Sequence, residues 1–83
     1  MRKTIYYILL DKKENQKIAI NNDEINIIII KGNKDYISSG ILGNRANIVY
    51  LDSRFNTNEY QDLINCCIKP ICTLFPNEGI IFI

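Results

Sequence analysis

The cysteines have the widest chemical repertoire of any residue type in this chain. Cys66, Cys67 and Cys72 lie in one short segment, and thiolates act as nucleophiles or as metal ligands. The chain has no histidine, so a zinc site would need a carboxylate or water as its fourth ligand, and a nucleophilic thiol would lack its usual base. On a helix, Cys66 and Cys67 would also point about 100° apart. We therefore predict buried or half-buried structural thiols, no metal, no cofactor and no enzymatic activity.

Two other groups of residues are of types that can do chemistry. Asp52 and Glu59 are carboxylates, but their spacing does not pair them, and caps or solvated faces explain them better. Residues 32–47 carry three of the four glycines, two serines, Lys34 and Arg45, so their backbone amides could face an anion. The segment Ser38-Ser39-Gly40-Ile41-Leu42-Gly43 matches neither a Walker phosphate loop nor a dinucleotide fingerprint. A plain hairpin with a bulge is the preferred interpretation.

A single-stranded nucleic-acid interface is an alternative, because such proteins stack bases on sheet aromatics beside basic loops. The net charge of +1 gives no bulk attraction to nucleic acid or to an anionic membrane. This alternative is therefore not favoured. Its residues would be Lys31, Lys34, Arg45 and Arg54, with Tyr36 and Tyr50 nearby.

The size and composition of the chain indicate one small globular domain. Its 83 residues are near the lower limit for folding without a metal or disulfides, and we predict a single compact domain over residues 1–83. Hydrophobic residues make up 47% of the chain, but no apolar stretch approaches the ~20 residues of a membrane span. The short N-terminal apolar stretch is followed by Asp11-Lys12-Lys13-Glu14 instead of a cleavage site. We predict a cytoplasmic protein without membrane contact.

The elements that must position all these residues centre on the run Ile25-Asn26-Ile27-Ile28-Ile29-Ile30. Side chains alternate faces along a strand, so four consecutive isoleucines put two on each face. A strand that is covered on both faces has such a continuous apolar sequence. The run therefore predicts a strand in the middle of the sheet, and residues 3–10 show the same two-sided pattern.

The remaining elements complete an α+β pattern. Strands are predicted at 17–20, with Ile18 and Ile20 inward, at 47–52 and at 80–83, and 36–42 is a further candidate strand. An apolar stripe of helical period predicts one helix over about 57–69, which Pro70 either ends or kinks on its way to residue 75. The fold class is α+β, with a small, mostly antiparallel sheet of five or six strands and the helix on one face. The stripe is Tyr60, Leu63, Ile64, Cys67, Ile68, Ile71, Leu74 and Phe75.

With no catalytic constellation, the leading hypothesis is a non-enzymatic protein-binding module. Eighteen isoleucines and eleven asparagines suggest an AT-rich genome, which is compatible with a phage- or mobile-element-encoded inhibitor of a host complex. Single-stranded nucleic-acid binding and a structural homo-oligomer are the alternatives. One helix covers only one face of the strand at 27–30, so its other face curls, packs on 36–42, or meets a second copy in a homodimer. The candidate partner-binding residues are Lys34, Asp35, Asn44, Arg45, Arg54, Gln61, Asp62, Asn65 and Lys69.

Overall fold

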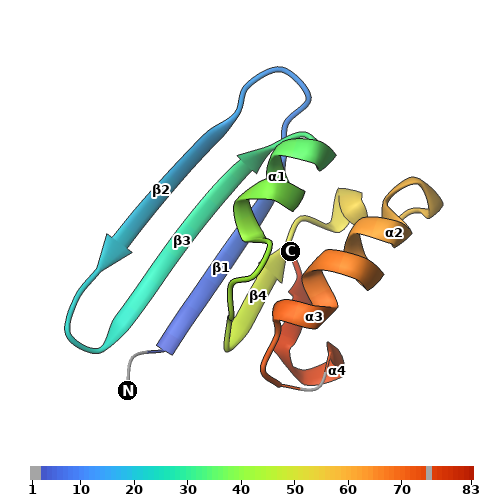
Figure 1. Ribbon diagram of the computed structural model, residues 1–83. Coiled ribbons are helices and arrows are strands. Elements are labelled where there is room, and N and C mark those ends of the chain that lie inside the picture. The colour runs from blue at the N-terminus through green and yellow to red at the C-terminus, as the bar shows by residue number, and fades with distance from the viewer. Residues whose placement is uncertain (1–2, 75) are drawn as a thin grey trace.

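The computed structural model describes residues 3–74 and 76–83, and it contains one five-stranded sheet with helices on one side (Figure 1). The strand order across the sheet is β2-β3-β1-β4-β5. The strands predicted at 3–10, 17–20, 25–30, 47–52 and 80–83 are all present. Their bounds are β1 (Lys3–Leu10), β2 (Gln16–Asn21), β3 (Ile25–Gly32), β4 (Ile48–Leu51) and β5 (Ile80–Phe82).

The prediction of a mostly antiparallel sheet is wrong, because the sheet is mixed. Strand β1 pairs in parallel with both β3 and β4, and β4 pairs in parallel with β5. Among the strands of the described residues, only the β2–β3 hairpin is antiparallel. The cause lies in the connections, since helical segments join β3 to β4 and β4 to β5 and return the chain to the same end of the sheet each time.

Helix α1 (Lys34–Ile41) replaces the candidate strand at 36–42, which is the second correction. The side chain of Asn33 caps it by accepting a hydrogen bond from the backbone N–H of Tyr36 at 2.8 Å. Ile37 and Ile41, four residues apart, are both fully buried. The turn residues and the low helix propensity of the serines and glycine conceal this short helical period in the sequence.

The second helical run continues through Pro70. Here the backbone N–H of Lys69 donates to the carbonyl of Ile64, five residues earlier, so the turn before the proline is a wide π turn. The helix therefore ends at Ile71, two residues beyond the end predicted near Lys69, and residues 72–74 do not continue it, while Phe75 lies outside the described residues. The run comprises a 3₁₀ turn (Asn58–Tyr60), α2 (Gln61–Leu63), the π turn η3 (Ile64–Ile68) and α3 (Lys69–Ile71), and a short α4 (Pro76–Gly79) precedes β5.

The hydrophobic core lies between the helices and one face of the sheet, which we call the helix face. From β1, Tyr6 and Ile8 enter this core, while from β3 it is Ile30 that is fully buried. The predicted helical stripe packs onto them through its buried members, whereas Leu74 is exposed. The buried apolar side chains are Tyr6, Ile8, Ile30, Ile37, Ile41, Ala46, Val49, Leu51, Phe55, Tyr60, Leu63, Ile64, Ile68 and Ile71.

Strand order explains why the helices share one side. The crossovers from β3 to β4 and from β4 to β5 run in the same direction across the sheet. Right-handed crossovers that run in one direction place their helices on one face. Only the step from β1 to β3 runs the opposite way, and there the connecting segment is β2, which joins the sheet as an edge strand. None of the described helices covers the second sheet face.

Gly40 lets α1 approach β3 closely, because an added methyl group would overlap the side chain of the fully buried Ile30. We expect Gly40→Ala to lower the free energy of unfolding by up to about 2 kcal/mol, since overpacking costs about 1–3 kcal/mol and the gain in helix propensity offsets about 1 kcal/mol. Urea denaturation measures this change. Ser39→Ala, at the exposed neighbouring position, should stay within about 0.5 kcal/mol of the wild type. A Gly40→Ala protein that is more stable than the wild type would contradict the close packing.

Candidate functional site

The residues that the sequence predicts to bind a partner do not form one surface. The structure places them on four separate segments, where Lys34, Asp35 and Asp62 line one groove and Asn44 and Arg45 line another. Asn44 and Arg45 lie together on the turn after α1. The other four are Arg54, in the 3₁₀ turn η1 (Ser53–Phe55), Gln61 on α2, Asn65 on η3 and Lys69 on α3.

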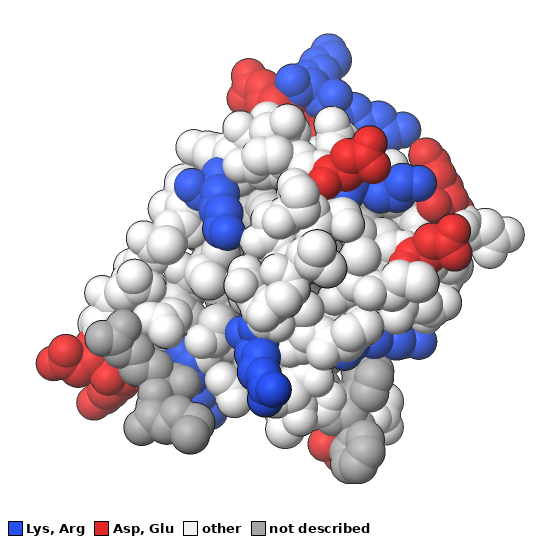
Figure 2. Space-filling model, in the orientation of Figure 1, with Lys and Arg blue, Asp and Glu red and all other residues white. Residues whose placement is uncertain are grey.

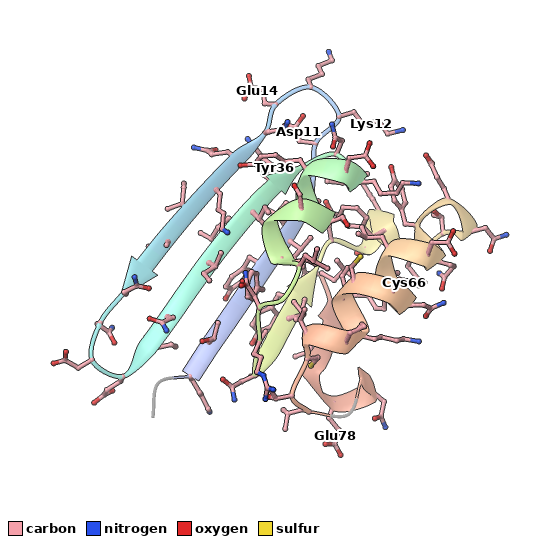
Figure 3. The ribbon with its side chains drawn as sticks, viewed as in Figure 1. Asp11, Lys12, Glu14, Tyr36, Cys66 and Glu78 are labelled. Carbon is pink, nitrogen blue, oxygen red and sulfur yellow. The ribbon has the colours of Figure 1, made fainter. Side chains whose placement is uncertain are left out.

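The three thiols lie on or beside the second helical run. Cys66 is exposed, which corrects its predicted burial, while Cys67 and Cys72 are half-buried. The Sγ of Cys67 lies 3.3 Å from the Oγ of Ser38. All three line a groove of about 440 Å³ together with the turn after α1. No three metal-ligating side chains cluster anywhere in residues 3–74 and 76–83, and Figure 3 places Cys66 on the helical layer, apart from Asp11, Lys12 and Glu14 on the β1–β2 loop.

Asp52 and Arg54 join the carboxyl ends of β1 and β4. The carboxylate of Asp52 accepts hydrogen bonds from the backbone N–H of Leu10 at 3.0 Å and from Nη2 of Arg54 at 2.7 Å. Nη2 of Arg54 also donates to the carbonyl oxygen of Leu10 at 2.9 Å. The guanidinium of Arg54 and the backbone N–H groups of Leu10 and Arg54, which also donate to the carboxylate, hold the pKa of Asp52 below its usual range. Arg54 is therefore a structural partner of Asp52, and Glu59, which is exposed, takes no part in this pair.

A second ion pair lies at the same end of the sheet. Nζ of Lys31 is 3.7 Å from a carboxylate oxygen of Asp11, and the backbone N–H groups of Lys13 and Glu14 donate to that carboxylate. These donors, with Lys31, lower the pKa of Asp11. The carboxyl ends of parallel strands are common ligand sites, but two of the cations near this edge, Lys31 and Arg54, are already paired with carboxylates.

The helix side of the molecule carries charges of both signs. Figure 2 views the molecule from this side and shows Lys and Arg side chains interspersed with Asp and Glu around a mostly uncharged centre. On the face in view they form no continuous basic patch. The two tyrosines expected beside basic loops are also on different elements, since Tyr36 is on α1 and Tyr50 is on β4.

The most distinctive surface is the sheet face opposite the helices, which we call the open face. On β1, Ile5, Tyr7 and Leu9 alternate with the buried Tyr6 and Ile8 and are only half-buried. The parallel register brings the alternate isoleucines of β3 and the outward residues of β4 onto the same face. The apolar side chains of the open face are Ile5, Tyr7, Leu9, Ile18, Ile20, Ile25, Ile27, Ile29, Ile48, Tyr50 and Ile81.

Strand β2 extends the open face to one edge of the sheet. Ile18 and Ile20 pair with Ile29 and Ile27, so they lie on the open face and not inward as the sequence predicts. They are 41% and 53% exposed. The physical reason is that β2 lies beyond the helical layer, which it meets through a hydrogen bond from Nζ of Lys17 to the carbonyl oxygen of Gly40 at 3.1 Å.

An aromatic pair lies near the middle of the open face. The rings of Tyr7 and Tyr50, on the adjacent strands β1 and β4, stack with centroids 4.8 Å apart and planes 17° apart. Charge on the face is confined to the strand ends, where Lys3 begins β1 and Lys31 lies near the end of β3. The list of candidate partner-binding residues contains none of these side chains, although the nucleic-acid alternative included Lys31 and Tyr50 and the apolar character of both faces of β1 and β3 was visible in the sequence.

Comparison with known proteins identifies no relative of this chain. No family model matches the chain, and no curated protein or solved structure matches it. Among the described residues, no helix is long and apolar enough to cross a membrane.

The Asp52–Arg54 pair predicts a pH-dependent stability. The pKa of Asp52 is lower in the folded than in the unfolded state, so its stabilising effect is present above about pH 4 and is lost as the pH falls through the folded pKa. We expect Asp52→Asn to lower the free energy of unfolding by about 1–2 kcal/mol at pH 7, because bonds to a charged group contribute about 1.5–3 kcal/mol and asparagine keeps an acceptor for Leu10.

Urea denaturation from pH 7 to pH 3 measures the difference between the two proteins. The difference should stay level down to about pH 5 and shrink below about pH 4. Asp62→Asn, which changes an exposed carboxylate on α2, serves as the control. Its free energy of unfolding should not differ from that of the wild type in this way. If the difference in the free energy of unfolding between Asp52→Asn and the wild type is as large at pH 3 as at pH 7, the charge of Asp52 is not its source.

Proposed function

We propose that this protein is a non-enzymatic protein-binding module whose binding surface is the open face of the sheet. The observation that carries the proposal is the continuous apolar surface across all five strands, with lysines only at the strand ends. Monomeric proteins rarely expose contiguous apolar patches larger than about 300–600 Å², and larger patches mark interaction surfaces. Such a module would act by occupying its partner's surface, as a phage- or mobile-element-encoded inhibitor of a host complex does.

A protein partner fits this surface better than a nucleic acid does. Single-strand binders present aromatic rings to bases beside cationic groups that contact phosphates. Here the two rings, Tyr7 and Tyr50, stack on each other, and aliphatic side chains surround them. Lys31, one of the two lysines on the open face, is paired with Asp11. The surface offers apolar area, which suits a protein interface, and few groups that would bind phosphates.

Both a second copy of the chain and another protein meet this description. In either case the contacts involve the open face and not the helix side. The tyrosines allow a direct comparison of the two sides, because Tyr50 on the open face and Tyr36 on α1 are both half-buried.

We expect a photocrosslinker at Tyr50 to trap a protein and one at Tyr36 not to. Tyr50 and Tyr36 are each replaced, in separate variants, by p-benzoylphenylalanine, and the cells that make the protein are irradiated. The mass of each adduct is measured, and its sensitivity to protease and to nuclease is tested. A protease-sensitive adduct from position 50, absent from position 36, supports the proposal.

Three results would count against a protein-binding open face. These are no adduct from position 50, adducts of equal yield from both positions, and an adduct that nuclease removes. The last result would identify the single-stranded nucleic-acid alternative, because the crosslinked partner would then be a nucleic acid. Circular dichroism of each purified variant shows whether the substitution preserves the fold.

A further inference from the structure

We propose that the partner on the open face is a second copy of this chain, so that two open faces pack together in a two-fold symmetric dimer. The proposal rests on the proposed function and names the partner of the same surface. In a two-fold dimer the same patch of both subunits forms the interface. The open face is suited to this arrangement in area, in chemistry and in shape.

The area of the open face is sufficient for a stable dimer. Five strands spaced about 4.8 Å apart make a face about 24 Å wide. The strands have three to eight residues, which at about 3.3 Å per residue gives a mean length of about 20 Å. Two such faces in contact remove about 960 Å² in total from water before the relief of the side chains is added, which is close to the roughly 1,000 Å² that a specific interface needs.

The chemistry of the face favours self-association over a hetero-complex. Apart from Tyr7 and Tyr50, every apolar side chain on it is isoleucine or leucine, so the interior of the face has few groups that could specify a partner by hydrogen bonds. Obligate homodimer interfaces are the more hydrophobic class and resemble a domain core cut in half. A second open face supplies an equally apolar surface, and the polar groups that it brings near the centre are the hydroxyls of Tyr7 and Tyr50, which can both donate and accept across the interface.

The shape of the face also suits a second sheet. Two sheets pack face to face about 10 Å apart with their strands aligned to within about 30°. Strand β1 is the third of five, so the Tyr7–Tyr50 stack lies near the centre, where the residues that contribute most to binding concentrate. Lys3 and Lys31 lie toward the ends of their strands, where both ammonium groups can remain in water at the rim.

The two faces of β2 provide a matched test. Ile18 and Ile20 lie on the open face, while Ala19 lies between them on the opposite face. All three are exposed on an edge strand, so lysine at these positions places its charge in water in the monomer. We expect the purified wild type to sediment at micromolar concentration with about twice the 9.6 kDa chain mass.

The double variant Ile18→Lys/Ile20→Lys should dissociate at least about 100-fold more readily, because it removes two apolar side chains per subunit and puts four like charges into the interface. Ala19→Lys, with one lysine on the other face of the same strand, should sediment as the wild type does. Thermal denaturation followed by circular dichroism verifies that each variant is folded. Ile29→Lys, at the centre of the face, should give a monomer as well.

The proposal fails if the wild type is a 9.6 kDa monomer at about 100 μM, or if Ile18→Lys/Ile20→Lys and Ala19→Lys alter the mass equally. The photocrosslink at position 50 separates this failure from a failure of the proposed function. An adduct of twice the chain mass supports both, whereas an adduct with a different protein from a monomeric chain keeps the binding module and removes the homodimer.

Discussion

The handedness of the two helical crossovers is the constraint on which the rest of this structure depends. From β3 the chain passes over β1 to β4, and from β4 it passes to β5, always in the same direction. Right-handed crossovers in one direction stack their helices on one face. In doubly wound sheets the direction reverses and helices cover both faces. Here the connection from β1 to β3, which runs in the opposite direction, contains the edge strand β2. This segment widens the sheet and does not cover its second face.

Two kinds of burial follow from this one-sided architecture. On the helix face, Tyr6, Ile8, Val49 and Leu51 are at most 1% exposed. Their neighbours along β1 and β4, with side chains of the same apolar type, remain half-buried because only adjacent side chains of the sheet shield them. At the carboxyl ends of the strands, the Asp52–Arg54 pair fixes β4 to β1 and the Asp11–Lys31 pair fixes the β1–β2 loop to β3, and they do so from the edge of the sheet without covering the open face.

Sequence reasoning located strands well because burial and strand period act locally. The isoleucines of 25–30 and the alternation at 47–52 determine their strands within a few residues. The direction of pairing is not local, since it depends on α1, whose signal consists of Asn33 as a cap and two isoleucines four residues apart. Once residues 36–42 are taken for a strand, parallel neighbours have no crossover helix and an antiparallel sheet follows. The effect of Pro70 on the helix was difficult to predict for a related reason. Proline has no backbone N–H, and the π turn that precedes it changes which carbonyl oxygen is left without a donor at that position.

The site residues could not be predicted from types and spacing, because the candidate surface contains no chemically distinctive group. The prediction selected charged and amide side chains, and the structure uses several of these for itself, as Arg54 on Asp52 shows. What the sequence did contain was an apolar pattern too extensive for the elements available to cover it. Ile28 and Ile30 point toward α1, while Ile27 and Ile29 point away from every described helix. A strand whose sequence is typical of burial on both faces, in a chain whose described helices cover one, is what the proposed dimer would explain. In the proposed dimer the second copy supplies the missing layer, and the four consecutive isoleucines are then consistent with their surroundings on both faces.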